Sequence, residues 1–413
     1  SDLAKGYGAP FDEISRDVIA LISELARHKL VTGPVDLVSR TASEGTVAYI
    51  DEARFSWQPD RGNERPLASL DIELTARCNL NCRHCYARLP IEDPHATALE
   101  VTDEELDRIT DEGLKLGLVR CLLTGGEPLL SLDFPRRYAR LRSKGLLLTI
   151  FTNATLITPK QVQLFRAAPP DLIEVTIYGA TQACYERVTR MPGSYRRFRD
   201  GLSRLLDAGL RVRLKAMVMR SNLEEFEEMA SFAKLVDPYF RFSPFLFLRH
   251  DGCITRNAEI VAERLSAAEI KALAVAYPDN QADMKVDLRE PDGPASDARC
   301  LIKCSAGQAS GMISYDGKFR LCTALSLPDA TYDLRSGSLR EAWEVFVPAV
   351  RRELRSEDAE FLSTCGTCRL LSICFWCPGR AYLECGRPDR PVPYYCAAAH
   401  ELATTSQRRN RER

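Results

Sequence analysis

Cys78-Asn79-Leu80-Asn81-Cys82-Arg83-His84-Cys85 places three cysteines at C-x3-C-x2-C spacing, directly after an apolar run from Leu70 to Leu74. Three thiolates on one loop can bind three irons of a four-iron cubane cluster, which leaves the fourth iron free to bind a small molecule. A structural zinc site is the alternative, with His84 as the fourth ligand, but zinc sites favour paired C-x2-C units. The spacing therefore favours a reactive [4Fe-4S] cluster bound by Cys78, Cys82 and Cys85.

The composition is that of an ordinary globular protein. The 413 residues are 45% hydrophobic and 27% charged, and the length allows two or three domains. Lys and Arg number 56 against 57 Asp and Glu, so no basic field argues for nucleic acid as a partner. No apolar run approaches the roughly 20 residues that span a bilayer, and residues 1–10 do not resemble a signal peptide. We expect a cytoplasmic protein that binds neither membrane nor nucleic acid.

The cysteines are numerous for a cytoplasmic chain, and most of them are clustered. Of fifteen, three lie at 78–85 and nine lie between 300 and 396. In a reducing compartment, clustered cysteines indicate metal ligands more readily than disulfides. The isolated Cys184 and Cys253 are given no role, and Cys121, within an apolar run, is expected to be a small buried side chain.

Residues 1–66 form the first of three expected domains. Apolar side chains recur at helical spacing between residues 11 and 31, and 46–57 has the composition of short strands. The helix resembles the helical half of the small winged-helix domains that recognise precursor peptides in ribosomal-peptide maturation. Only ten residues precede it, too few for the strands with which such a domain begins. A helix that caps the catalytic domain is therefore the alternative.

Residues 67–285 alternate between short strands and amphipathic helices, which predicts an α/β domain. Six β–α repeats imply a parallel sheet with right-handed crossovers that curls into a partial (β/α)6 TIM-like barrel. Ligands bind such barrels at the carboxyl ends of the strands, where the cysteine loop would lie. The expected strands are 70–74, 118–123, 146–151, 172–177, 211–219 and 239–247, and the expected helices are 102–116, 134–143, 159–167, 181–189, 195–208 and 223–236.

A second motif, Thr124-Gly125-Gly126-Glu127-Pro128, follows the second expected strand. Its two glycines allow a ligand to approach the backbone closely, and Glu127 offers a carboxylate to a ligand ammonium. Alone, it is a common strand-to-loop turn. One β–α unit after the cysteine loop, and on the same barrel face, it resembles the corresponding motif of the radical S-adenosylmethionine (SAM) superfamily. The resemblance implies that SAM chelates the open iron and that Gly125, Gly126 and Glu127 hold its methionyl amino group.

The same resemblance assigns SAM contacts to four further residues. It places Asn153, after the third strand, near SAM, and Thr176, at the end of the fourth, at the ribose in the place of the usual serine. Lys215 on the fifth strand would reach the SAM carboxylate, and His84 stands at the aromatic position that borders adenine. The alternative interpretations are turn polarity, strand alternation and, for His84, a solvated loop residue.

Residues 286–413 lack the strand–helix alternation and are dense in cysteine, so we expect metal ligation to stabilise this region. Cys300-x3-Cys304-x12-Gly317-x4-Cys322, followed by a C-x2-C-x5-C-x2-C run at 365–377, resembles the SPASM extension of radical SAM enzymes that modify peptides. The resemblance implies two auxiliary [4Fe-4S] clusters. The first would take Cys300, Cys304, Cys322 and Cys377, and the second Cys365, Cys368, Cys374 and Cys396.

Two features depart from the SPASM pattern. The gap between Cys374 and Cys377 is one residue shorter than the family's usual gap, so Cys377 is the least supported ligand. Cys385 is a ninth cysteine that could replace Cys396 or bind substrate. A zinc ribbon built from the two C-x2-C pairs is the alternative, and it would leave the other four cysteines of the pattern unexplained.

The resemblance implies a radical SAM oxidoreductase that reductively cleaves SAM to a 5′-deoxyadenosyl radical and takes hydrogen from its substrate. Residues 176–222 are similar to maturases that cross-link ribosomally made peptides, in particular thioether formers of the sactipeptide and ranthipeptide kind. We therefore predict a peptide maturase that forms an oxidative cross-link, with a thioether favoured. Expected partners are a precursor peptide, an electron donor such as a flavodoxin or ferredoxin, and a separate peptide-recognition protein as the alternative to residues 1–66.

Three other functions stay open. One is oxidation of a protein side chain, as sulfatase maturases perform it, and another is decarboxylation or dehydrogenation of a small molecule. The third is an iron–sulfur electron-transfer protein without SAM turnover. The glycines and Glu127 argue against the third, because an electron carrier needs no ammonium-binding carboxylate.

Overall fold

The computed structural model describes residues 65–278, 297–371 and 373–409. The fold below belongs to the second of two compact units, Leu67–Arg413. The helix expected at 11–31 and the strands expected at 46–57 lie outside the described residues. Within the described part, no helix is long and apolar enough to cross a membrane.

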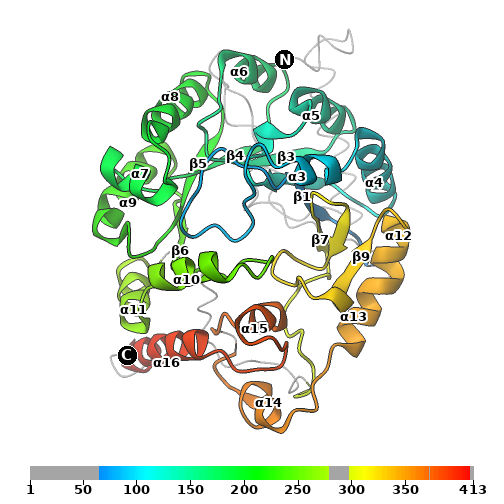
Figure 1. Ribbon diagram of the computed structural model, residues 1–413, viewed down its shortest axis with the longest axis vertical. Coiled ribbons are helices and arrows are strands. Elements are labelled where there is room, and N and C mark those ends of the chain that lie inside the picture. Colours follow the sequence, from blue (N-terminus) through cyan, green and yellow to red (C-terminus); the bar gives the residue numbers. More distant parts are fainter. Residues whose placement is uncertain (1–64, 279–296, 372, 410–413) are drawn as a thin grey trace, which may run out of the picture. The chain divides into compact units, whose positions relative to one another are not determined.

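Six parallel strands form the partial barrel that the sequence predicts, and this fold class is confirmed. Pairing follows chain order through β1 (Ser69–Thr75), β2 (Arg120–Gly125), β3 (Leu147–Thr152), β4 (Leu172–Thr176), β5 (Val212–Met217) and β6 (Arg241–Ser243). Helices surround the strands in Figure 1, so they cover the outer face of the sheet. They are α4 (Asp103–Lys115), α5 (Phe134–Ser143), α6 (Pro159–Ala167), α7 (Gln182–Thr189), α8 (Ser194–Asp207) and α9 (Phe226–Val236).

The strands present an apolar face to the helices and a polar face to the barrel lumen. Leu70, Ile72 and Leu74 of β1 are no more than 2% exposed and belong to the apolar core. Successive side chains of a strand point to opposite faces, so Asp71 and Glu73 point into the lumen. The barrel therefore encloses ionisable side chains within an apolar shell.

The C-terminal region adds three strands to the barrel sheet, which the sequence analysis did not predict. β7 (Ser310–Ile313) pairs parallel with β1, and β8 (Lys318–Arg320) and β9 (Thr331–Asp333) follow antiparallel. The order of the sheet is β6-β5-β4-β3-β2-β1-β7-β8-β9. Strands of three or four residues carry too few positions to show a periodic pattern, which explains the omission.

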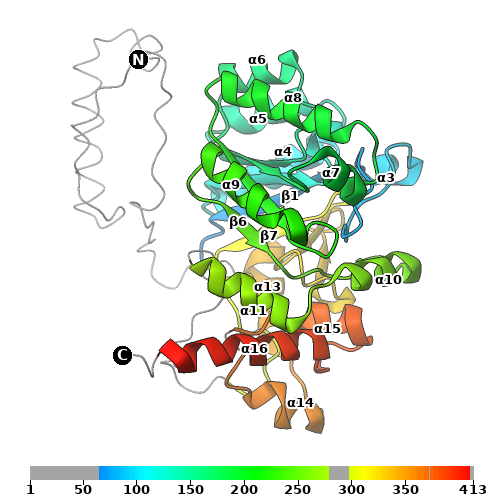
Figure 2. The same cartoon turned by 90° about the vertical axis from the view of Figure 1, so that its left-hand side faces the viewer.

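Short helices build much of the remaining described chain. They are α3 (Pro94–Leu99), α10 (Ile254–Glu263), α11 (Ala267–Ala276), α12 (Leu339–Glu341), the π-helix η6 (Ala342–Phe346), α13 (Val347–Glu353), α14 (Ala359–Ser363), α15 (Pro378–Cys385), α16 (Pro393–Arg409) and the 3₁₀ turns η2 (Pro128–Leu130), η3 (Leu223–Glu225), η5 (Pro328–Ala330) and η7 (Cys365–Thr367). α16 lies beside α11 in Figure 2, and Lys271 pairs there with Glu401 at 3.1 Å. Phe319, Trp343 and Phe361 are at most 1% exposed, so apolar packing also stabilises the C-terminal region.

α8 packs directly against the backbone that leaves β3. A side-chain carbon at Gly201 of α8 would overlap the carbonyl oxygen of Ala154. Ala154 has φ 59°, a left-handed conformation that costs a non-glycine residue roughly 1–3 kcal/mol. The close approach therefore holds the end of β3 in a strained shape on the ligand-binding face of the barrel.

We expect Gly201→Ala to destabilise the protein by roughly 1–3 kcal/mol, although alanine favours helix formation, because the methyl group must push α8 away from Ala154. Ser203→Ala, at an exposed position of the same helix, is the matched control and should change stability by less than about 0.5 kcal/mol. Chemical denaturation measures both. Equal unfolding midpoints for Gly201→Ala and the wild type would contradict the packing argument.

Candidate functional site

Three thiols converge at the carboxyl end of β1. Cys78 and Cys82 are buried, and Cys85 is half-buried. Burial raises the pKa of the Cys78 thiol to about 12, and Glu127 and Cys85 add to the rise. Burial also raises the pKa of Cys82, with further contributions from Cys78 and Cys85. Such a group favours a positively charged partner that stabilises thiolates, which an iron–sulfur cluster supplies.

The alternative zinc site is not formed in the part of the chain that the structure describes. Among residues 65–278, 297–371 and 373–409, no three His, Cys, Asp or Glu side chains lie close enough to hold one metal ion. The ligands of a zinc ion surround one centre, whereas cluster ligands bind separate irons and stand farther apart. His84 packs against Tyr178 instead, with ring centroids 5.6 Å apart. Burial, and then Arg256, lower the pKa of His84 to about 4, so its ring is neutral.

Two arginines from the far edge of the sheet hold the cysteine loop. Arg249, which is buried, donates to the carbonyl oxygens of Cys85 at 3.2 Å and Arg88 at 3.1 Å. Arg256 donates to the carbonyl oxygen of Cys82 at 2.8 Å. Both arginines follow β6, so their contacts join the two edges of the barrel. The sequence analysis missed them because 161 to 174 residues separate each arginine from its partners, and no local pattern marks such a contact.

The two glycines after β2 are required by the chain itself. Gly125 has φ 133°, and a side-chain carbon there would overlap the carbonyl oxygen of Thr75. A side-chain carbon at Gly126 would overlap the carbonyl oxygens of Ala76 and Arg77. The sequence analysis attributed these glycines to the approach of a ligand. The structure adds a second cause, which is the close packing of this turn on the backbone that enters the cysteine loop.

Glu127 joins the end of β2 to the end of β3. Its carboxylate is fully buried and accepts hydrogen bonds from the Thr152 hydroxyl at 2.7 Å and the backbone N–H of Asn153 at 2.8 Å. The backbone N–H of Leu129 also donates to it at 3.3 Å. Burial raises the pKa of Glu127 to about 7, although these hydrogen bonds oppose the rise. Its contact with a SAM ammonium stays a prediction, while its observed partners are the strand ends.

Asn153 lies against the cysteine loop, at the place where a SAM contact was predicted. Its side-chain amide donates to the Asn79 side-chain oxygen at 3.0 Å and lies 3.8 Å from the Cys78 sulfur. Its own side-chain oxygen accepts from the Thr155 hydroxyl at 2.6 Å and the Thr155 backbone N–H at 2.9 Å. Asn153 is therefore positioned beside Cys78, a predicted cluster ligand.

Thr176 and Lys215 are opposite each other on β4 and β5. The Lys215 ammonium lies 3.5 Å from the Glu174 carboxylate and over the ring of Phe151, inside the barrel. Burial lowers the pKa of Lys215 to about 7, and Glu174 opposes the shift. The observed partner of Lys215 is thus a lumen carboxylate, and the predicted contacts of Lys215 and Thr176 with SAM remain predictions.

Residues 72–233 match the family model of the radical SAM superfamily. The chain is a radical SAM enzyme. Enzymes of this superfamily use a [4Fe-4S] cluster and SAM, and the convergent Cys78, Cys82 and Cys85 are the residues here that would hold the cluster.

Relatives of this radical SAM enzyme act on different substrates, as their names state. AdoMet-dependent heme synthase of Methanosarcina barkeri is 29% identical over 78% of this chain and 94% of its own. PqqA peptide cyclase of Ruegeria pomeroyi is 26% identical over 81% of this chain and 88% of its own.

Two solved structures share the fold. Streptococcus suis SuiB bound to precursor peptide SuiA has a TM-score of 0.59 at 17% identity, covering 79% of this chain and 74% of SuiB. The protein anSMEcpe with bound AdoMet and Cp18Cys peptide has a TM-score of 0.57 at 15% identity, covering 83% of this chain and 98% of its own. At such identities the likeness establishes the fold.

In the C-terminal region of this radical SAM enzyme, four cysteines line one pocket. They are the predicted second auxiliary set, Cys365, Cys368, Cys374 and Cys396, and Trp376, Val392 and His400 line the same pocket. Burial raises the pKa of Cys374 to about 11, and the other three cysteines add to the rise. Cys385 does not line this pocket, and its sulfur lies 3.8 Å from the Pro391 carbonyl oxygen instead. Cys396 is therefore the better placed of the two candidate ligands.

Three cysteines of the predicted first auxiliary set are neighbours. Burial raises the pKa of Cys322 to about 11, and Cys377 and then Cys304 add to the rise. Gly317, with φ 77°, forms the turn between β7 and β8. This turn positions β8 and, after it, Cys322. The fourth member, Cys300, lies near Lys303, which is also a neighbour of Cys365 and Cys368 of the second set. Burial lowers the pKa of Lys303, and these three cysteines oppose that shift.

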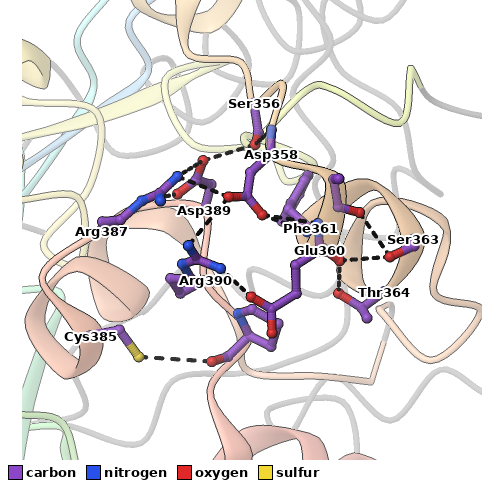
Figure 3. Close-up of polar contacts among 12 residues, drawn as sticks. Ser356, Asp358, Glu360, Phe361, Ser363, Thr364, Cys385, Arg387, Asp389 and Arg390 are labelled. Carbon is purple, nitrogen blue, oxygen red and sulfur yellow. Dashed lines mark hydrogen bonds and ion pairs between the residues drawn. The ribbon is translucent and has the colours of Figure 1, made fainter.

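A network of ion pairs fastens the segment between α15 and α16 to α14 (Figure 3). Asp358 pairs with Arg387 at 3.1 Å and with Arg390 at 3.4 Å. Arg390 also pairs with Glu360, and Arg387 with Asp389 at 3.0 Å. α14 precedes the first two cysteines of the second set and α16 carries the last, so the network holds the two sides of the pocket together.

If the chain binds the three clusters that the sequence predicts, about twelve irons in all, we expect Asp358→Ala to lower the iron content to about eight per chain, because the variant loses the cap of α14 and both arginine partners. Glu357→Ala, whose side chain is 87% exposed, is the matched control and should keep the wild-type iron content. Iron and sulfide analysis of anaerobically purified protein measures this. Full iron content in Asp358→Ala would show that the network does not support the second set.

Two lumen carboxylates resist ionisation. Burial raises the pKa of Asp71 to about 6, and Lys215 opposes the rise. Burial also raises the pKa of Glu73 to about 7, and Arg320 opposes the rise. Because the folded state binds these protons more tightly than the unfolded state, the stability they contribute is complete at low pH. It is lost as pH rises through the folded pKa.

Glu73 should therefore contribute less stability at about pH 7.5 than at about pH 5, and Glu73→Gln should remove on the order of 2 kcal/mol of this loss relative to the wild type. Urea denaturation at the two pH values measures the loss. Glu92→Gln, at an exposed position, should leave it unchanged. A Glu73→Gln variant with the wild-type pH dependence would show that Glu73 is ionised without cost.

Proposed function

We propose that this radical SAM enzyme modifies a precursor peptide and forms an oxidative cross-link, with a thioether between a cysteine sulfur and a carbon of another residue favoured. The observation that carries the proposal is the pocket lined by Cys365, Cys368, Cys374 and Cys396, with a further group of cysteines around Cys322. Two relatives support a peptide substrate, since one is named PqqA peptide cyclase and SuiB was solved with precursor peptide SuiA.

An oxidative cross-link has a stoichiometry that suits two cysteine sets beyond the SAM site. Joining sulfur to carbon removes two hydrogens from the peptide. One leaves as an atom and the other as a proton and an electron, so an electron acceptor is required. When bound, a cluster with SAM supplies the radical that takes the hydrogen atom, and auxiliary clusters supply the electron acceptor.

The residues of the chain position and protect this chemistry. Cys78, Cys82 and Cys85 would hold the first cluster, and Arg249 and Arg256 hold the carbonyl groups of two of these ligands. Gly125, Gly126, Glu127 and Asn153 form the adjoining strand ends, where we place the methionyl group of SAM. The apolar shell of the barrel keeps water away from the lumen.

The proposal includes the division of the chain and its partners. We assign residues 1–66 to peptide recognition, 67–285 to the radical SAM barrel and 286–413 to the auxiliary clusters. A separate recognition protein is the alternative to the first assignment. A flavodoxin or ferredoxin would supply the electron for SAM cleavage, and the cytoplasm is the expected compartment.

A second candidate function is supported by a specific comparison. The heme synthase of Methanosarcina barkeri matches this chain over 94% of its length, and another relative is named Fe-coproporphyrin III synthase, so a small-molecule substrate such as an iron porphyrin is the competing proposal. The structure of anSMEcpe was likewise solved with a peptide, and oxidation of a single side chain remains a variant of the peptide proposal.

With SAM, a reductant and the short peptide encoded beside the gene, we expect mass spectrometry to show a loss of two hydrogens and one fewer alkylatable thiol. Cys78→Ala should give neither 5′-deoxyadenosine nor product. Cys374→Ala should still release 5′-deoxyadenosine but should lose at least about nine-tenths of the product, because its second set is incomplete. An unmodified peptide, together with decarboxylation of iron coproporphyrin III, would favour the second candidate.

A further inference from the structure

Two rows of side chains cross β1, β7 and β8 on opposite faces of the sheet. Residues that pair across neighbouring strands point to the same face. The first row is buried in the apolar core and consists of Ile72, Ile313 and Phe319. The second row consists of Asp71, Met312 and Arg320. Because the first row faces the core, the second faces the lumen, and Arg320 extends the lumen beyond the six barrel strands.

Three polar side chains at this place have unused hydrogen-bonding capacity. The ring of Tyr86 lies 5.2 Å from the ring of His250, and Arg320 is close enough to His250 to act on its charge. Within residues 65–278, 297–371 and 373–409, the Arg320 guanidinium, the Tyr86 hydroxyl and the His250 ring make no hydrogen bond or ion pair. Burial lowers the pKa of His250 to about 4, so the ring is neutral and has one N–H to donate.

The position of these donors connects them with both cysteine groups. Tyr86 directly follows Cys85, and Arg320 stands two residues before Cys322. A ligand held by Tyr86 and Arg320 would therefore contact residues that are close in sequence to a predicted ligand of each cysteine group.

An unpaired, half-buried guanidinium with neutral donors beside it suits a carboxylate, because the planar fork of arginine matches the two carboxylate oxygens. We propose that Arg320, Tyr86 and His250 bind a substrate carboxylate in the barrel lumen, and that this is an Asp or Glu side chain of the precursor peptide. This assignment of substrate class rests on the proposed peptide maturation. Asp71 and Glu73 can accept the backbone N–H groups that flank such a residue in a peptide.

Arg320→Met and Arg320→Lys test the proposal, with Lys318→Met as the matched control on the same strand, where it loses only the pair with Asp333 at 2.6 Å. Equal iron content verifies that each variant folds. Each acidic residue of the precursor peptide is changed in turn to its amide. We expect one amide peptide to raise KM about tenfold or more with the wild type, and Arg320→Met to raise KM for the native peptide by a similar factor.

The combination of protein and peptide changes decides the matter. If Arg320 binds that carboxylate, the KM of Arg320→Met should be the same for the amide peptide as for the native peptide. Arg320→Lys should have a KM for the native peptide between those of Arg320→Met and the wild type. Unchanged KM in Arg320→Met, or full additivity of the two changes, would overturn the proposal.

A second probe covers the case in which the wild type modifies no peptide, which would refute the proposed function. Iron coproporphyrin III and its tetramethyl ester are then titrated by absorbance. Binding of the free acid that is weakened about tenfold in Arg320→Met, with no difference for the ester, would retain the carboxylate site and assign it to a porphyrin. Equal affinity of both proteins for the free acid would overturn the carboxylate site itself.

Discussion

Burial of the Cys78 and Cys82 thiols, beside the half-buried Cys85, is the constraint on which the site depends. Thiols removed from water ionise only beside a positive charge, so the loop must be held open for a cluster by groups outside it. Arg249 and Arg256 provide that support through the carbonyl groups of Cys85 and Cys82. Because both arginines follow β6, the last barrel strand, their hydrogen bonds connect the end of the barrel to the loop that follows its first strand.

Glu127 supports the same loop from the other side. The backbone N–H groups of Gly126 and Glu127 donate to the carbonyl oxygens of Thr75 at 2.7 Å and Arg77 at 2.9 Å. The carboxylate of Glu127 in turn accepts from Thr152 and Asn153 at the end of β3. A motif that the sequence indicates as a ligand site therefore also connects the ends of β1, β2 and β3 by hydrogen bonds. The two roles are compatible, because these hydrogen bonds fix the backbone that the predicted ligand would contact.

Features set by local order could be predicted from the sequence, and those set by distant contacts could not. The spacing of Cys78, Cys82 and Cys85 and the glycines before Glu127 carry their own geometry, and six strand–helix repeats dictate the barrel. Arg249 shows no such signal, since its partner Cys85 is 164 residues away. The choice between Cys385 and Cys396 needed the helical phase of α16, which brings Cys396, Ala399 and His400 to one pocket.

The hairpin of β7 and β8 places the proposed substrate contact Arg320 and the predicted cluster ligand Cys322 close together in the chain. Parallel pairing with β1 fixes the register of β7, and the turn at Gly317 fixes that of β8. A slip of one residue would exchange Arg320 for a core residue and would move Cys322 away from Cys377. The four-residue spacing from Gly317 to Cys322 is thus a geometric requirement for both groups. Any change that keeps the cysteine but alters this spacing should disturb the lumen as well as the cluster ligands.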